Sequence, residues 1–558
     1  MPEPTEAAMS LLRDRYMQDD EHSWSGICNR VAHNIASQET EEENQIYYEG
    51  EFFAILKRMD FIPNSPTLMN AGTDLQFLSA CLVLPVEDSI EGIFSAIKEQ
   101  AQVSKAGAGT GFAFSRLRPK GSLVSSTGEP SSGPIPFMEI FDKNTDAIIQ
   151  GGRRKGANMA VMRVDHPDIT EFINIKYEPD RRNQEILQKL KDNMQLNREQ
   201  IAKAKRILVE SQFTNFNISV GANAKFMEAV EKDGEIELTN PKDGESWGKI
   251  PARELWQKII ERAWTNGDPG MVWLDKINEE HPVNERIESV NVCGEVPLLP
   301  YESCNLGAIN LANFAEKGSF DWSRLEKVIP VAVRFLDNVI DANEYPVPDI
   351  EKSTKKYRKI GVGVMGFHEA LIRQNIAYDS EEALEFADYL FQFINSKAIE
   401  ASQDLAKEKG KFPGFDNTTI DKPRRNAVLT TVAPTGSRSM IANTSGGIEP
   451  FYSMKYKHID SEGNERMMDY DFTEVADDDV LVTALEIEPE WHVRMQAAAQ
   501  RYVGSAVSKT VNLPNDATVK DVSDIYKMAY DLGCKGITIY RNGSRAEQVL
   551  NDCPECQV

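Results

Sequence analysis

The segment Val290-Asn-Val-Cys-Gly-Glu-Val-Pro-Leu298 has the short apolar run and the β-branched residues that are typical of a strand. Similar segments recur along the chain at 215–220, 360–364, 428–433 and 536–540. Helical patterns over 254–263, 325–340 and 382–407 alternate with them. Alternating strands and helices predict a mainly parallel sheet with helices outside it. We therefore expect one compact α/β unit.

The first sixty residues, 1–60, differ from this pattern. They are polar, and Glu42 to Met59 carries apolar residues at helical spacing, so we expect an N-terminal helical cap. The whole chain has 558 residues, with 62 Lys and Arg against 87 Asp and Glu, a net charge of −25. This excess of negative charge repels phosphate backbones, so no nucleic-acid polymer is expected as a partner. No membrane span or signal peptide is recognisable, and we expect a cytoplasmic protein with no membrane partner.

The seven cysteines carry more information than the composition. In a large cytoplasmic chain a disulfide framework is not expected, so functional cysteines would be metal ligands, nucleophiles or redox groups. Cys28 and Cys534 are interpreted as buried thiols. The pair Cys553-Pro-Glu-Cys556 has three interpretations: a mobile dithiol, an inert tail or half of a zinc site. No second ligand pair accompanies it, so no metal is expected and the dithiol is favoured.

Asn291, Cys293 and Glu295 are spaced two residues apart. In an extended segment they would share one face and bring an amide, a thiol and a carboxylate into one pocket. The alternative is an accidental pattern in which Cys293 is a buried small hydrophobe. A nearby carboxylate raises the pKa of a thiol, which makes it a poor nucleophile but keeps it neutral, as hydrogen-atom chemistry requires.

Four motifs, in this order, resemble the catalytic subunits of ribonucleotide reductases, and the resemblance extends from about Asn64 to the C-terminus. They are Asn64-Ser-Pro-Thr-Leu-Met-Asn-Ala-Gly72, the Asn291/Cys293/Glu295 triplet, Ser303-Cys-Asn-Leu-Gly-Ala-Ile-Asn-Leu311, and Pro434-Thr-Gly436 leading to Thr444-Ser-Gly-Gly-Ile-Glu-Pro450.

The resemblance implies a ten-stranded α/β barrel over 61–545 with Cys293 on a central loop, a helical insertion at about 181–211 and a redox-active tail at 546–558. It implies that Cys293 forms a thiyl radical that removes the ribose 3′-hydrogen. Glu295 would take the 3′-hydroxyl proton, Asn291 would orient the ribose, and Cys81 with Cys304 would supply two electrons. The tail cysteines, Cys553 and Cys556, would then reduce the resulting disulfide and be reduced by thioredoxin or glutaredoxin.

Residues matching substrate contacts of the family are Ser65, Ala80, Gly109, Thr435, Gly436, Ser437 and Arg438. The segment 433–440 is expected to end a strand and open a helix, whose free amides and hydroxyls could hold a diphosphate. Family members often carry Pro-Thr-Gly-Thr-Ile-Ser here, whereas this chain has Ser437 and Arg438 in place of the Thr and Ile. The added Arg could tighten binding or favour a triphosphate.

Asp88 and Arg118 match positions that bind a specificity effector, a deoxynucleoside triphosphate or ATP. The alternatives are that Asp88 caps a helix starting near Ser89 and that Arg118 is a solvated charge. The loop that reports effector identity matches Gly151, Gly152, Arg153, Arg154, Lys155 and Gly156.

The source of the radical divides the family. A separate metal-containing subunit passes the radical through two adjacent tyrosines in the last barrel strand, but here Ile539-Tyr540 offers one. The pattern favours adenosylcobalamin as cofactor; the alternative is a radical from a metal-containing partner subunit with an atypical relay. A catalytically dead nucleotide-binding regulator is disfavoured, because all five catalytic residues are present. The N-terminus leaves no room for an ATP cone, so inhibition by dATP at such a site is not expected.

Apolar residues over 187–208 follow a heptad seam with one polar position, Asn197. The seam either covers its own domain or contacts a second subunit. The resemblance favours a homodimer without deciding between these two roles.

Overall fold

The computed structural model describes residues 3–148, 156–193, 200–201, 203–204, 213–459, 465–544 and 550–552. Its main feature is a seven-stranded sheet in the order β17-β18-β8-β5-β4-β3-β2. The strands are β2 (Cys81–Pro85), β3 (Gly109–Ala113), β4 (Asn158–Arg163), β5 (Phe216–Ala222), β8 (Gly270–Trp273), β17 (Thr510–Leu513) and β18 (Gly536–Arg541). The five from β2 to β8 run parallel, β18 is antiparallel to β8, and β17 is parallel to β18.

A second sheet completes a ring with the first. It contains β1 (Phe61–Pro63), β11 (Leu306–Asn310) and β14 (Gly361–Met365) in the order β1-β11-β14. Isolated bridges link Leu82 to Ser303, Val362 to Thr430, and Val432 to Val507. Ten described segments thus follow one another in a ring: β2, β3, β4, β5, β8, β18, 507–513, 430–432, β14 and β11. Each half of five is parallel, and the halves meet antiparallel, which agrees with the expected barrel.

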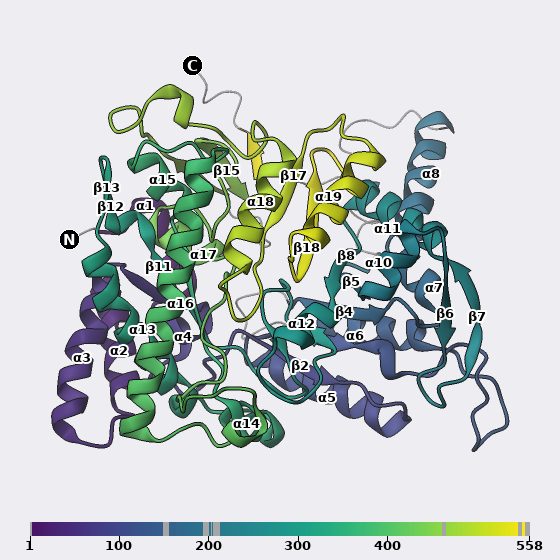
Figure 1. The fold of residues 1–558 in the computed structure, drawn as a ribbon, viewed down its shortest axis with the longest axis horizontal. Coiled ribbons are helices and arrows are strands. Elements are labelled where there is room, and N and C mark those ends of the chain that lie inside the picture. Colours follow the sequence, from purple (N-terminus) through teal and green to yellow (C-terminus); the bar gives the residue numbers. More distant parts are fainter. Residues whose placement is uncertain are drawn as a thin grey trace.

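Helices cover the outside of the ring (Figure 1). One apolar core lies between the seven-stranded sheet and α5 (Ile90–Lys105), α6 (Pro134–Ala147), α11 (Ala252–Asn266) and α19 (Val519–Asp531). The other joins β1, β11 and β14 to α13 (Trp322–Ala342) and α16 (Glu381–Lys409). Residues of α18 (Pro489–Gln500) belong to both cores. The helical patterns over 254–263, 325–340 and 382–407 are confirmed, since they fall within α11, α13 and α16.

The N-terminal helices α1 (Glu6–Arg15), α2 (Trp24–Ala36) and α3 (Glu42–Lys57) pack onto the second core. Trp24 is fully buried there, and its indole N–H donates to the Leu56 carbonyl at 3.2 Å. In Figure 1 α2 and α3 lie beside α13, on the opposite side of the molecule from α11. The helices expected at the N-terminus are therefore present, and they share a core with the barrel.

Smaller elements connect these layers. The helices are α4 (Ser65–Asn70), α7 (Ile169–Asn174), α8 (Tyr177–Asn193), α10 (Ala224–Glu231), α12 (Leu274–Glu280), α14 (Pro348–Tyr357), α15 (Phe367–Arg373) and α17 (Gly436–Ala442). Outer hairpins pair β6 (Glu235–Thr239) with β7 (Ser246–Pro251), and β15 (Lys455–Ile459) with β16 (Glu465–Asp469). β19 (Leu550–Asp552) adds to β15. None of the helices in the described ranges is both long and apolar enough to cross a membrane.

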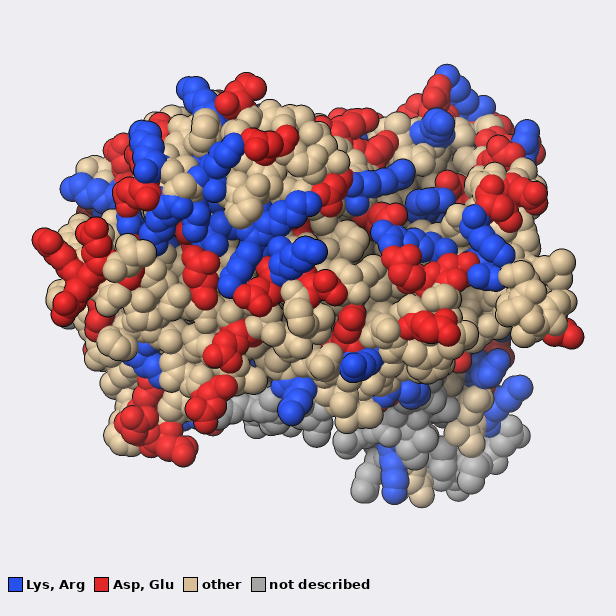
Figure 2. Space-filling view, turned by 90° about the horizontal axis from the view of Figure 1, so that it is seen from below, with Lys and Arg blue, Asp and Glu red and all other residues tan. Residues whose placement is uncertain are grey.

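The charges of this acidic protein are interspersed. Figure 2 shows blue and red side chains side by side on the face seen from below. On α14, at the lower edge of Figure 1, Lys355 pairs with Glu351 at 2.7 Å and Lys356 pairs with Glu285 at 2.7 Å. Two of the three lysines of this helix are therefore engaged in local ion pairs.

The prediction of a single strand over 290–298 is wrong. The chain forms β9 (Ser289–Val290) and β10 (Pro297–Leu298), which pair antiparallel, and a tight turn over 291–296 joins them. Gly294 has φ +79°, a conformation that residues with a Cβ rarely adopt, and its N–H donates to the Asn291 carbonyl at 3.1 Å. Cys293 therefore lies at the tip of a hairpin, which strand alternation did not predict.

Candidate active site

The hairpin that carries Cys293 is held inside the ring by both halves. The Val292 carbonyl accepts a hydrogen bond from the Asn217 side chain of β5 at 3.0 Å. The Glu295 carbonyl accepts from the Ala506 N–H and from the Thr431 hydroxyl, each at 2.9 Å. Because Asn217 belongs to one half and Thr431 and Ala506 to the other, the turn is fixed at the centre of the barrel.

Two glycines of β3 make room for this hairpin. A Cβ on Gly109 would come within 2.6 Å of Val292 Cγ2, and one on Gly111 would overlap the Val290 carbonyl oxygen. Gly109 and Gly111 therefore make β3 a strand against which the turn packs closely. Gly109, expected to contact substrate, is also the first residue of β3 and is paired with Cys81 of β2.

The three residues of the Asn-Cys-Glu triplet have different surroundings. Asn291 is fully buried, Glu295 is 3% exposed, and Cys293 is exposed. The Asn291 side-chain oxygen accepts from the Val296 N–H at 2.9 Å, which stabilises the turn. Among the described residues, Asn291 Nδ2 and Glu295 Oε2 have no hydrogen-bond partner. An unused donor and an unused acceptor thus lie beside an accessible thiol.

Burial and neighbouring groups oppose each other at Glu295. Burial raises the pKa of the Glu295 carboxyl, whereas the neighbouring Asn291 side chain and the positive charge of Arg438 lower it. A buried carboxyl whose pKa is raised takes up a proton more readily than an exposed one, which suits it to proton transfer with a bound ligand.

Cys81 and Cys304 lie side by side on facing segments. The Cys304 N–H donates to the Cys81 carbonyl at 2.8 Å, and the Cys81 N–H donates to Cys304 Sγ at 3.0 Å. Burial and the Cys81 thiol raise the pKa of Cys304 well above its usual value. Both thiols are therefore close enough to interact, and Cys304 is held neutral, although they are 223 residues apart in sequence.

These residues line a single cavity of about 300 Å³. All seven residues expected to contact substrate line it, together with Cys81, Cys293 and Glu295: Ser65, Ala80, Gly109, Thr435, Gly436, Ser437 and Arg438. Thr435, with φ +56°, precedes α17, so Gly436 and Ser437 provide the first helical amides as the sequence predicted. Cys304 and Asn291 lie behind this surface.

Comparison with known proteins agrees with this geometry. The family model "Ribonucleotide reductase, barrel domain" matches residues 79–424 and 420–540, and "Ribonucleotide reductase, all-alpha domain" matches 2–76. The chain belongs to the ribonucleotide reductase family. The expected family membership and α/β barrel fold are thereby confirmed.

Within this family the chain is similar to proteins named for vitamin B12. It is 43% identical to the vitamin B12-dependent ribonucleoside-diphosphate reductase of Mycobacterium tuberculosis strain CDC 1551, over 98% of this chain and 80% of that protein. It is 44% identical to the protein of the same name from Thermoplasma acidophilum, over 90% of this chain and 66% of that protein. A ribonucleoside-diphosphate reductase subunit alpha from Chlamydia muridarum is 28% identical over 96% of this chain and 58% of that protein.

The two residues expected to bind an effector contact each other. Arg118 Nε donates to both carboxylate oxygens of Asp88, at 2.8 and 3.0 Å, and the Arg118 N–H donates to the same carboxylate. The side chain that caps α5 is Ser89, which accepts from the Gly92 N–H at 3.0 Å, so the capping alternative for Asp88 is not observed. Arg118 is paired with a carboxylate, which also argues against a merely solvated charge.

Several predicted residues lie outside the described residues. They are Gly151, Gly152, Arg153, Arg154 and Lys155 of the specificity loop, and the tail cysteines Cys553 and Cys556. Gly156 is described and buried. Of the heptad seam, the part up to Asn193 belongs to α8, which begins at Tyr177, and most of the remainder is outside the described residues.

Two further residues, not predicted as site residues, lie near the cavity. Tyr16, at the end of α1, is 2% exposed, and its hydroxyl is 2.9 Å from Ser65 Oγ. Asn64 caps α4 by accepting from the Thr67 N–H, and its Nδ2, which has no partner in the described chain, belongs to a residue that lines the cavity. An Asn directly before Ser65-Pro66 is a local signal for a helix cap, whereas no local signal connects Tyr16 to Ser65, because 49 residues separate them.

Proposed function

We propose that this chain reduces ribonucleoside diphosphates to 2′-deoxyribonucleotides by radical chemistry at Cys293, with adenosylcobalamin as cofactor. The observation that carries the proposal is one cavity in which an exposed Cys293 thiol, the buried Glu295 carboxyl and the Cys81 thiol converge. The names of the relatives at 43% and 44% identity support both the diphosphate substrate and the cobalamin.

The surroundings of Cys293 fit a cofactor that reaches the thiol from outside. Cys293 is exposed, and a Cβ on the adjacent Gly294 would meet no heavy atom within 4 Å. Adenosylcobalamin, when bound, supplies the radical that removes the hydrogen atom from Cys293 Sγ. The sequence of β18 supports this over a partner subunit, because Ile539 precedes Tyr540 and leaves one tyrosine where a stepwise relay would use two.

Each residue of the Asn-Cys-Glu triplet and of the Cys81/Cys304 pair has a distinct role in the proposed reaction. Cys293 Sγ takes the 3′-hydrogen atom of the ribose and later returns it. Glu295 accepts the 3′-hydroxyl proton, and Asn291 Nδ2 donates to a ribose oxygen. The 2′-hydroxyl leaves as water after protonation by a thiol. Cys81 and Cys304 supply the two electrons and become a disulfide, so each turnover converts a ribonucleotide and a dithiol into a deoxyribonucleotide, water and a disulfide.

The diphosphate fits the other end of the cavity. Thr435, Gly436 and Ser437, at the start of α17, line this end, and Ser65 lines it from α4. Ala80 and Gly109 have small side chains or none, which leaves space for the nucleotide between them. Arg438 is the positively charged residue of this surface.

Regulation and assembly extend the proposal. The Asp88 and Arg118 pair would bind a deoxynucleoside triphosphate or ATP, and the 151–156 loop would report its identity to the substrate. Ile90, Phe94 and Ile140, on α5 and α6, are 58%, 48% and 39% exposed. Apolar side chains on two adjacent helices next to the effector residues support a homodimer through this face.

The tail cysteines, Cys553 and Cys556, would be reduced by thioredoxin or glutaredoxin and would then regenerate the Cys81 and Cys304 thiols. A cytoplasmic location fits this role, because reducing proteins in the cytoplasm keep thiols reduced.

The test uses the purified full chain with adenosylcobalamin, a dithiol reductant and one ribonucleotide at each phosphate level. We expect deoxyribonucleotide from the diphosphate without any added subunit, and no product from Cys293→Ser, because a hydroxyl does not form the required radical. Cys534→Ser, which alters a buried thiol away from the cavity, should retain activity. Activity that required a metal-containing subunit would contradict the cofactor assignment, and product from Cys293→Ser would contradict the mechanism.

A further inference from the structure

The cavity contains an unpaired buried cation. Arg438, the third residue of α17, is 6% exposed, and among the described residues its Nη1 donates to the Ile62 carbonyl at 3.3 Å. A guanidinium carries five N–H donors. Within the described ranges Arg438 forms no ion pair. Each of its guanidinium nitrogens either has a hydrogen-bond partner or is accessible to solvent. Because Arg438 lines the cavity, its unused donors are available to a ligand there.

The same cavity contains an unpaired buried carboxyl. Among the described residues that line it, Arg438 is the only cation and Glu295 the only carboxyl group. Glu295 is 3% exposed, has an unpartnered Oε2, and forms no ion pair within the described chain. Burying either charge alone is unfavourable, because water is removed and no opposite charge replaces it. Each is therefore the one opposite charge that the described lining of the cavity offers the other.

We propose that Arg438 is a positioning residue whose charge favours the ionised form of Glu295, so that the carboxylate can accept the ribose proton. This inference rests on the proposed function and deepens it. Arg438 acts across the cavity without a direct ion pair, which leaves Glu295 Oε2 without a partner in the described chain and able to approach substrate. A direct ion pair would have occupied the acceptor that the reaction needs.

The other titratable groups around Glu295 cannot replace this charge. Cys81 and Cys293 line the cavity, and Cys304 lies behind it, but a thiol offers no positive charge. Tyr16 lies near Arg438 and is likewise never cationic. Burial lowers the pKa of Arg438 to about 10, so the guanidinium stays protonated at neutral pH. Burial raises the pKa of Glu295 and the charge of Arg438 lowers it, so removing that charge moves protonation of Glu295 to higher pH.

The direct test is an infrared pH titration of the full chain without cofactor or substrate. The carbonyl stretch of a protonated carboxylic acid would be assigned to Glu295 by its loss in Glu295→Gln. We expect this band to appear at higher pH in Arg438→Met than in the parent protein, and Arg438→Lys to restore the parent titration. Arg438→Gln serves as a second neutral variant if Arg438→Met does not fold.

Arg424 provides a matched control. It is also a largely buried arginine without an ion pair in the described chain, burial likewise lowers its pKa to about 10, and it is not among the residues lining the cavity. Arg424→Met should leave the Glu295 band unchanged. An unchanged band in both Arg438→Met and Arg438→Gln would overturn the proposal, as would an equal shift in Arg424→Met.

The pH dependence of kcat/KM distinguishes an effect of Arg438 on Glu295 from a role of Arg438 in phosphate binding. If Arg438 acts on Glu295, Arg438→Met loses about tenfold in kcat/KM on the acid limb of the pH profile and little on the plateau. A rise in KM for the diphosphate that is equal at every pH would mean that Arg438 only anchors phosphate, and would overturn the proposal. If the parent chain forms no deoxyribonucleotide, the proposed function fails, while the infrared titration still decides whether Arg438 controls Glu295.

Discussion

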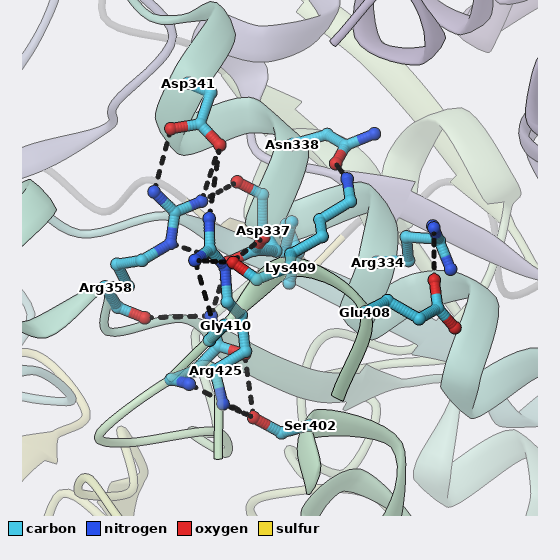
Figure 3. Close-up of polar contacts among 12 residues, drawn as sticks. Arg334, Asp337, Asn338, Asp341, Arg358, Ser402, Glu408, Lys409, Gly410 and Arg425 are labelled. Carbon is cyan, nitrogen blue, oxygen red and sulfur yellow. Dashed lines mark hydrogen bonds and ion pairs between the residues drawn. The ribbon is translucent and has the colours of Figure 1, made fainter. Parts of the chain in front are cut away.

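Two regions of the molecule bury charged side chains in opposite ways. At the end of α13, Asp337 is fully buried and accepts from Arg358 Nε at 2.8 Å, Arg425 Nε at 3.1 Å and Asn426 Nδ2 at 2.9 Å (Figure 3). Arg358 also pairs with Asp341 at 2.7 Å. In the cavity, by contrast, Glu295 and Arg438 are just as buried, and neither has an ion-pair partner among the described residues.

The presence or absence of ion pairs distinguishes buried charges that stabilise the fold from buried charges that are available to a ligand. In the Asp337 cluster each charged group has an opposite charge within hydrogen-bonding distance, so the cluster fixes α13 against the segments that precede β14 and the 428–433 strand. The cavity leaves a donor on Asn291 and an acceptor on Glu295 unused. Unused polar groups cost stability and are retained where a ligand can satisfy them.

The largest effect is expected from Glu295→Gln, which tests the functional side of the comparison. The amide cannot accept a proton, so we expect kcat/KM to fall by about a hundredfold to ten-thousandfold. The free energy of unfolding should stay the same or rise, because a buried carboxyl without an ion pair is removed. Steady-state assays and urea unfolding would measure the two quantities. A clear loss of stability would show that Glu295 is structural and would break the comparison.

Asp337→Ala tests the structural side. Removing this carboxylate leaves Arg358 and Arg425 buried without one of their partners, so we expect unfolding to become easier by about 3–5 kcal/mol. The folded fraction of the variant should retain the parent KM, because Asp337 is not among the described residues that line the cavity. Urea unfolding followed by circular dichroism would measure the change. Stability within about 1 kcal/mol of the parent would contradict the assignment.

The next largest effect is expected at Glu39, a second buried and paired carboxylate, whose contribution to the free energy of unfolding should depend on pH. Glu39 accepts from Arg334 at 2.9 Å, Asn338 at 2.8 Å and Lys409 at 2.9 Å. Burial alone would raise the pKa of Glu39, but these hydrogen bonds lower it to about 2. Because the folded pKa lies below the unfolded one, the stabilisation is fully present above about pH 4.5 and is lost as the pH falls towards 2.

We therefore expect Glu39→Gln to be less stable than the parent by roughly 3 kcal/mol at pH 7, and this gap to narrow as the pH falls from 5 to 3. Urea unfolding at a series of pH values would measure the gap. Glu42→Gln, at an exposed position in α3, removes the same charge without the buried contacts and should show little gap at any pH. A gap for Glu39→Gln that stayed constant with pH would contradict the prediction.

The smallest effect is expected from Tyr16→Phe, which removes the hydrogen bond to Ser65 Oγ. A neutral hydrogen bond of this kind contributes about 1 kcal/mol, so we expect KM to rise about fivefold with kcat unchanged. Tyr378→Phe is the matched control, because this equally buried hydroxyl donates to the Ile448 carbonyl at 2.7 Å and does not touch the cavity. A fall in kcat with unchanged KM would contradict a positioning role for Tyr16.

The sequence predicted the chemistry better than the local geometry. The motifs around Cys81, Cys293 and Cys304 indicated the reacting groups, and the strand and helix patterns indicated the α/β ring. The prediction of one extended strand through 290–298 was wrong, because the chain reverses at Gly294 and the Asn291 side chain stabilises the turn. The capping alternative for Asp88 also failed, because Arg118, 30 residues away, binds that carboxylate.

The sequence by itself determined which residue types were available: the thiols, the carboxyl, the glycines of β3 and an arginine in place of an apolar residue at 438. Only the tertiary structure decided which of them meet. Cys81 contacts Cys304 across 223 residues, Tyr16 reaches Ser65 across 49, and Glu295 shares a cavity with Arg438. The physical reason is that local patterns reflect the backbone and its immediate neighbours, whereas burial and the pairing of charges depend on segments that become neighbours only when the ring closes.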